Sequence, residues 1–61
     1  MTNFKITFDG MAPQIIDAKR LLSLRDWSAN ERAKLDLVYH NIIRRMSTEL
    51  DERPCDIERA P

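Results

Sequence analysis

The 61-residue sequence contains one cysteine, one glycine and one histidine, and each scarcity excludes a class of protein. Because Cys55 is alone, no disulfide can form within the chain, and we expect a free thiol in a reducing compartment. A single glycine excludes the glycine-rich loops that bind phosphates and dinucleotides. His40 lacks the nearby nucleophile and orienting group that covalent catalysis requires. We therefore expect a non-enzymatic protein with no catalytic residues, cofactor, metal site or small-molecule substrate.

Long hydrophobic runs and a targeting segment are also lacking. The longest strictly apolar runs have two or three residues, as at 37–39, whereas a membrane-spanning helix needs about 20. The first five residues, MTNFK, do not combine a basic start with an apolar run, as a signal peptide would. We therefore expect a cytoplasmic protein with no membrane partner.

The formal net charge is zero, but the charges are unevenly distributed. Residues 1–48 carry eight basic and five acidic side chains (+3), whereas residues 49–61 carry two basic and five acidic ones (−3). This asymmetry predicts a mildly basic body followed by an acidic tail. We expect a single mini-domain over residues 1–52 and a disordered tail over residues 53–61.

The clearest pattern that is present is that of an amphipathic helix. Ser28 and Glu31 have the spacing of a capping box, in which each side chain bonds the other's backbone N–H. Downstream, apolar residues recur every three or four positions, which places them on one helix face: Leu35, Val38, Tyr39, Ile42, Ile43, Met46 and Leu50. The pattern predicts a long helix from Ala29 to about Asp51. Pro54 closes it, because the residue before a proline disfavours helical geometry.

The N-terminal half combines a strand signal with an ambiguous segment. Residues 3–8 alternate between apolar and polar, which is typical of a half-buried strand, and Asp9-Gly10 supplies turn chemistry. Residues 11–17 fit either a second strand that closes a hairpin or the start of a helix at Pro13. We favour a first helix from Pro13 or Asp17 to Asp26, although a short β-bridge before a short helix also fits. The predicted fold class is α+β: an N-terminal β-strand or hairpin followed by two helices, the second long and amphipathic.

The apolar face of the second helix is wider than one strand and one short helix can cover, which predicts contact with another chain. Tyr39, Ile43 and Met46 suit an interface, since aromatic and adaptable side chains are enriched there. Leu37 projects nearly opposite this stripe and would be exposed in a monomer. Trp27 either plugs the turn before the helix or acts as an exposed anchor. The first hypothesis is a small protein-binding module, of inhibitor or adaptor type, that covers a partner's surface or pairs with itself as a homodimer.

The second hypothesis is a DNA-binding repressor. Over residues 3–48, the order of strand, helix, turn and helix resembles the ribbon-helix-helix family. The resemblance implies a dimer whose paired strands read the major groove, with backbone N–H groups at the second helix N-cap facing a phosphate. A basic patch beside the apolar face of the second helix is a further possible DNA contact. The candidate DNA-binding residues are Asn3, Lys5, Thr7, Ser28, Lys34 and Arg45.

Overall fold

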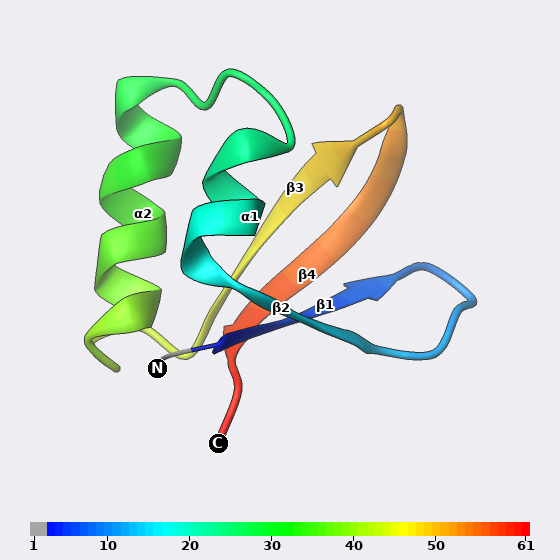
Figure 1. Ribbon diagram of the computed structural model, residues 1–61, viewed down its shortest axis with the longest axis horizontal. Coiled ribbons are helices and arrows are strands. Elements are labelled where there is room, and N and C mark those ends of the chain that lie inside the picture. Colours follow the sequence, from blue (N-terminus) through cyan, green and yellow to red (C-terminus); the bar gives the residue numbers. More distant parts are fainter. Residues whose placement is uncertain (1–2) are drawn as a thin grey trace.

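The computed structural model describes residues 3–61 and shows a four-stranded antiparallel sheet with two helices on one face (Figure 1). The elements in chain order are β1 (Asn3–Phe8), β2 (Gln14–Asp17), α1 (Ala18–Ser23), α2 (Ala29–Tyr39), β3 (Arg45–Leu50) and β4 (Arg53–Arg59). The strand order across the sheet is β2-β1-β4-β3. The two inner strands therefore come from opposite ends of the chain.

The N-terminal strand forms as its alternation predicts, and a hairpin follows it. Phe4 and Ile6 are buried, and Gly10 adopts a φ of +74° in the turn. β2 pairs antiparallel with β1, with Ile16 opposite Phe4, so a helix that begins at Pro13 is wrong and the hairpin interpretation of residues 11–17 is right. α1 begins only after Asp17, whose side chain caps it by accepting from the Arg20 N–H at 2.7 Å.

The second helix begins as predicted but ends early. Ser28 Oγ accepts from the Glu31 N–H at 3.1 Å, and Glu31 Oε1 accepts from the Ser28 N–H at 3.1 Å, which completes the capping box. α2 ends at Tyr39, because Asn41 adopts a left-handed φ of 59° and its N–H donates to the Val38 carbonyl. The prediction of a long amphipathic helix reaching Asp51 is therefore wrong, although α+β remains broadly compatible with the structure.

The chain after α2 forms a second hairpin instead of the predicted helix end and tail. Met46 and Leu50 are buried on β3, where they recur with the period of two of a strand. The expectation of a disordered tail over residues 53–61 is wrong, since β4 occupies Arg53–Arg59 and buries Cys55 and Ile57. β4 pairs with β1 on one side and with β3 on the other.

The β3–β4 turn has two central residues, Asp51 and Glu52, with φ values of 52° and 61°. Positive φ at both positions is the backbone of a type I′ turn, whose twist matches that of the flanking strands. Pro54 lies opposite Glu49. In an antiparallel hairpin, hydrogen-bonded pairs alternate with pairs that are not hydrogen-bonded, and the pair next to the two-residue turn is hydrogen-bonded. The Glu49–Pro54 pair is therefore not hydrogen-bonded, so the missing N–H of the proline costs no bond between β3 and β4.

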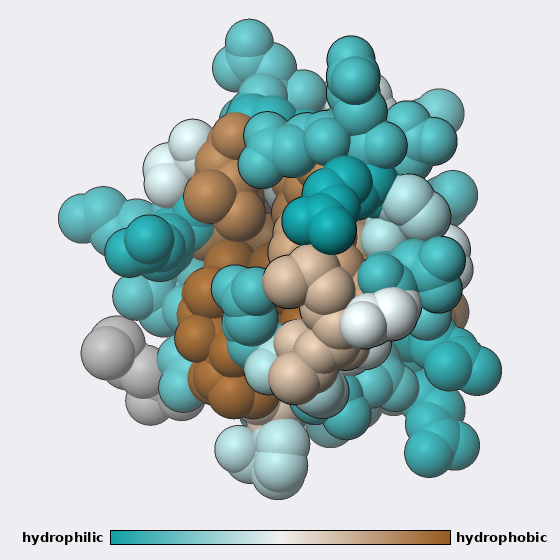
Figure 2. Space-filling view, turned by 90° about the vertical axis from the view of Figure 1, so that its right-hand side faces the viewer, coloured by the Kyte–Doolittle hydropathy of each residue, from teal (hydrophilic) through white to brown (hydrophobic). Residues whose placement is uncertain are grey.

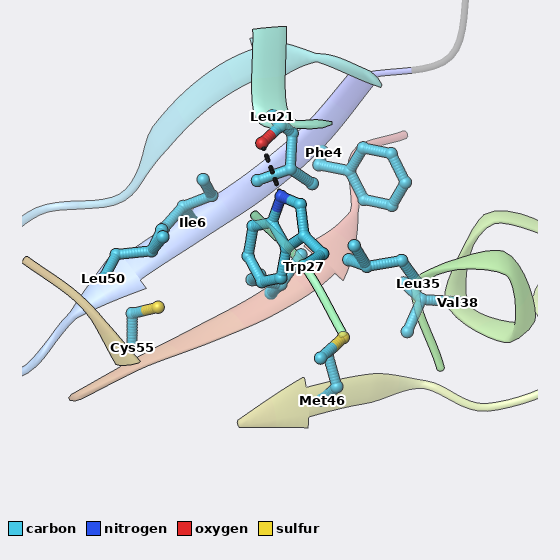
Figure 3. Packing of buried hydrophobic residues seen from close by; sticks show 10 residues of the cluster. Phe4, Ile6, Leu21, Trp27, Leu35, Val38, Met46, Leu50 and Cys55 are labelled. Carbon is cyan, nitrogen blue, oxygen red and sulfur yellow. Dashed lines mark hydrogen bonds between the residues drawn. The ribbon is translucent and has the colours of Figure 1, made fainter. Parts of the chain in front are cut away.

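The core lies between the sheet and the helices and draws on every element except β2. Trp27, in the α1–α2 connection, is only 5% exposed, and its indole N–H donates to the Leu21 carbonyl at 3.0 Å (Figure 3). The Arg25 guanidinium stacks 4.4 Å from the centre of the indole ring. None of the helices in residues 3–61 has the length and hydrophobicity needed to cross a membrane.

Candidate functional site

The residues predicted to bind a partner do not form one exposed stripe. Trp27 and Met46 are buried in the core, each 5% exposed. Ile43 and Leu37 are half-buried, and Ile43 packs against the core. Only Tyr39 is classed as exposed, at 37%. The stripe does not exist because its residues are divided among a helix, a loop and a strand.

The residues predicted to contact DNA are divided between the two sides of the molecule. Asn3, Lys5 and Thr7 project from the sheet face opposite the helices, because Phe4 and Ile6 alternate with them and are buried. Arg45 projects from the same face, since it lies beside buried Met46 on β3. Two of the candidates, Ser28 and Lys34, belong to the helical layer instead. The predicted patch of Lys34 with Arg45 is therefore not formed.

The ribbon-helix-helix arrangement is wrong for a topological reason. In that arrangement the N-terminal strand pairs with the same strand of a second chain. Here β1 is hydrogen-bonded to β2 along one edge and to β4 along the other, so it has no free edge. In addition, the Lys5 ammonium pairs with the Glu58 carboxylate at 3.1 Å, which offsets part of its charge.

The N-terminus of α2 is occupied by a side-chain carboxylate of the chain itself. Glu31 accepts from the Ser28 backbone N–H, from the Thr48 hydroxyl at 2.9 Å and from the Arg25 guanidinium. These hydrogen bonds, the Ser28 backbone bond foremost, lower the pKa of Glu31 to about 2. A phosphate at this helix end would have to compete with the Glu31 carboxylate for the Ser28 N–H and the Arg25 guanidinium, so the Ser28 N-cap is a poor anion site.

The groups capable of covalent or metal chemistry do not converge. The Cys55 thiol is buried, and burial, with the nearby Asp56 charge, raises its pKa, so its reactive thiolate form is disfavoured. His40 contacts Asp36 at 3.4 Å, one helical turn away. Within residues 3–61, no three His, Cys, Asp or Glu side chains are grouped so that they could hold a metal ion.

The most distinctive surface feature is a hollow where the helices leave one end of the sheet uncovered. It has a volume of about 650 Å³ and is bordered by the β1–β2 loop, the end of α1 and the β3–β4 turn. Its apolar lining consists of Ile6, Phe8, Met11, Ile15, Ile16, Leu24 and Leu50, and its charged lining of Asp17, Arg20, Arg25, Asp51 and Arg53. The side of the molecule drawn in Figure 2 shows hydrophobic surface bordered by hydrophilic side chains. We refer to this feature as the β-turn hollow.

The β-turn hollow combines exposed apolar side chains with fixed cations. Met11 is 43% and Leu24 48% exposed. The Arg53 guanidinium lies 5.8 Å from the centre of the Phe8 ring, and Arg25 donates from Nη1 to the Glu49 carbonyl at 2.6 Å. The Arg25 Nε is buried and has no hydrogen-bond partner within residues 3–61. The rim therefore presents arginine beside uncovered apolar surface.

A second, smaller groove of about 310 Å³ runs between the helices. Leu22, 46% exposed, and Tyr39 line it together with the buried Phe4 and Leu35. The Tyr39 ring packs against Phe4, with the ring centres 6.3 Å apart. This inter-helix groove is lined mainly by apolar side chains, and only Arg32 and Asp36 add charge to it.

Sequence reasoning missed the residues of the β-turn hollow. Met11 lies in the segment whose structure the sequence leaves open, and Arg53 lies in the predicted tail. A signal for the missing strand existed in the alternation of Cys55 and Ile57 with acidic residues. No family model, curated protein or solved structure matches the chain. Function therefore has to be inferred from the geometry of the molecule itself.

Proposed function

We propose that the protein is a small non-enzymatic protein-binding module, of inhibitor or adaptor type, and that it engages its partner through the β-turn hollow. The observation that supports this proposal is the gathering of uncovered Met11 and Leu24 with half-buried Phe8 and Ile16 in one concavity. Single exposed apolar residues are common on protein surfaces and need no explanation, whereas a concave cluster marks a binding surface.

The composition of the hollow indicates the kind of partner that fits it. Methionine and arginine are enriched in protein interfaces, where methionine adapts to a partner and arginine forms hot spots. The lining holds three arginines and two aspartates. Arg25 is already paired with Glu31, whereas Arg20 and Arg53 make no ion pair within residues 3–61 and can face an acidic partner. The fitting occupant is an apolar side chain of a partner protein that is flanked by acidic residues. Insertion of that side chain would place the rest of this protein over the partner's surface and block it.

The test compares two leucines of nearly equal exposure in different places. Leu24 lies in the β-turn hollow and is 48% exposed, whereas Leu22 lies in the inter-helix groove and is 46% exposed. Immobilised wild type, Leu24→Asp and Leu22→Asp are each exposed to a lysate of the source cells, and captured proteins are quantified by mass spectrometry. We expect one partner to be lost with Leu24→Asp and retained with Leu22→Asp.

The captured partner then allows an affinity measurement by calorimetry. Burying a fully exposed leucine side chain stabilises a complex by about 1.5–3 kcal/mol. Because Leu24 is only 48% exposed, binding can bury about half of that surface, worth about 0.7–1.5 kcal/mol, so Leu24→Ala should raise Kd roughly 3- to 12-fold. Arg53→Glu should also raise Kd, because it reverses a charge on the rim. A partner that binds Leu24→Asp as tightly as wild type would refute the proposal. Loss with Leu22→Asp alone would move the binding site to the inter-helix groove.

A further inference from the structure

The outer edge of β3 carries backbone groups that the sheet leaves unpaired. Within the described residues 3–61, β3 is the last strand of the sheet and pairs only with β4. The direction in which the backbone N–H and C=O groups of β3 point can be worked out from its neighbour β4. On β4, the Pro54 carbonyl accepts from the Asp9 N–H at 3.3 Å, so the backbone groups of Pro54 point toward β1. Since alternate residues point to alternate sides of a strand, Arg53, Cys55 and Ile57 bond β3.

On β3, the partners of these three residues are Leu50, Thr48 and Met46. The N–H and C=O groups of Arg45, Ser47 and Glu49 therefore point away from the sheet. Among the hydrogen bonds of residues 3–61, only one reaches them, from Arg25 Nη1 to the Glu49 carbonyl. A carbonyl oxygen can accept two hydrogen bonds, so this contact does not close the edge.

The opposite edge of the sheet is less suited to pairing. β2 has only four residues and leads directly into α1 through the Asp17 cap, so little extended backbone is available there. β3 has six residues. It contains no proline and no bulge, and its two charged residues, Arg45 and Glu49, have opposite signs, so they do not repel an identical strand as a row of like charges would.

We propose that the outer edge of β3 binds β3 of a second copy of this chain, antiparallel about a two-fold axis through Ser47. In this register Arg45 lies opposite Glu49 of the second copy, and Ser47 lies opposite its own counterpart. The two sheets join into one continuous sheet. This surface is distinct from the β-turn hollow and does not depend on the function proposed for it.

The side chains select this register. Opposite residues in an antiparallel pair share a sheet face, so Met46 and Leu50 must face residues on the helix side of the second copy. A register shifted by one residue would place them opposite residues of the open face. In the register centred on Ser47, each of Arg45, Ser47 and Glu49 lies opposite a residue of the other copy whose backbone groups also point outward. The other allowed registers leave at least one of these three residues without such a partner.

Charge complementarity supports the same register. Arg45 and Glu49 are both exposed, both project from the open face, and neither side chain makes an ion pair within residues 3–61. Two-fold symmetry brings them together twice, once on each side of Ser47. Opposite charges directly across a strand pair are stabilising and like charges are destabilising, so one chain supplies both halves of each ionic contact.

The helical layer is compatible with this arrangement. α2 packs over β3 and β4, whereas α1 packs over β1 and β2, so the side of α2 away from α1 is nearest the free edge. At about 100° per residue, Lys34 and Leu37 lie on this side, opposite the Arg32 and Tyr39 side that borders the inter-helix groove. Pairing of the edges would bring the two α2 helices side by side, with half-buried Leu37 between them.

Sedimentation equilibrium of the full chain tests the pairing. We expect the wild type to change with concentration from the chain mass of 7.2 kDa to twice that value. Ser47→Pro removes an outward N–H that makes no bond to β4, so the variant should remain folded and monomeric. Ser47→Ala is the matched control, because it also loses the hydroxyl contact to Asp56 but keeps the N–H, and it should dimerise like wild type.

Charge reversal tests the register without a proline. Arg45→Glu alone and Glu49→Arg alone each place like charges opposite one another and should raise the dimer Kd at least tenfold. The double variant exchanges the two charges and should restore dimerisation. A wild type that stays monomeric to millimolar concentration would overturn the proposal. So would a Ser47→Pro variant that dimerises normally, or a double variant no stronger than the single ones.

Discussion

Replacing Ile57 with alanine should remove a large share of the stability of this protein. Ile57 is fully buried on inner strand β4, opposite Ile6 of β1 and Met46 of β3. Truncating a buried isoleucine to alanine typically costs about 2–5 kcal/mol, because apolar burial is lost and a cavity remains. At roughly 0.05–0.15 kcal/mol per residue, a chain of 61 residues has a free energy of unfolding of only about 3–9 kcal/mol.

Urea unfolding monitored by the fluorescence of Trp27 measures this loss, since the indole is buried in the folded state. With a denaturant dependence of about 1 kcal/mol/M, typical of small proteins, the midpoint should fall by about 2–5 M or folding should be lost in water. Ile42→Ala is the matched control. The same side chain is 68% exposed at that position, and its removal should change the free energy of unfolding by less than about 0.5 kcal/mol.

The result that would refute this reasoning is an unchanged midpoint for Ile57→Ala. It would mean that residues 53–59 do not form an inner strand and that the acidic segment is disordered, as the charge pattern alone predicts. Equal losses for Ile57→Ala and Ile42→Ala would contradict the burial assigned to the two side chains.

Two further changes test the loops and caps. The pKa of Glu31 is about 2 in the folded state, below its ordinary value of 4.5, so its contribution to stability is present above about pH 4.5 and is lost as the pH falls toward 2. Urea midpoints of wild type and Glu31→Gln, measured between pH 7 and 2, should converge at the acidic end, and parallel curves would contradict the assigned contacts. Glu52→Gly should raise the free energy of unfolding by about 0.5–1 kcal/mol, because glycine adopts a positive φ without the strain of a Cβ. A lower thermal midpoint for this variant would argue against a left-handed residue at that position.

Local signals in the sequence were sufficient where one short segment determines its own structure. The Ser28–Glu31 capping box formed because both of its hydrogen bonds lie within four residues. The strand at residues 3–8 formed with Phe4 and Ile6 inward, because alternating apolar and polar residues place all the apolar side chains on one face of a strand. Neither inference depended on what lay elsewhere in the chain.

The region after His40 shows why local pattern was insufficient. Ile42, Ile43, Met46 and Leu50 fit a helical stripe, but Met46 and Leu50 also fit the period of a strand. Asn41 was the local sign that the helix ends, since asparagine tolerates the left-handed conformation that closes a helix. Pairing with β4 favours the strand over the helix for residues 45–50. Cys55 and Ile57 of β4 are buried in the core, where β4 pairs with β1 on one side and with β3 on the other.

The candidate site shows the same dependence on distant partners. The β-turn hollow joins Met11 of the first loop, Leu24 after α1, and Arg53 at the start of β4, and no sequence spacing relates these three positions. Their proximity follows from the hairpin geometry at both ends of the chain. A disordered tail over residues 53–61 would remove one wall of the hollow, so the sequence pattern does not predict this hollow.

By itself, the amino-acid sequence determined the N-terminal strand, the start of α2 and the absence of a disulfide within the chain. The tertiary structure alone decided the length of α2, the order of the strands, and which apolar side chains are buried and which remain exposed. The physical reason is the range of the interactions. Caps and alternation act within a few residues, whereas the inner position of β4 results from pairing with β1, about fifty residues earlier in the chain.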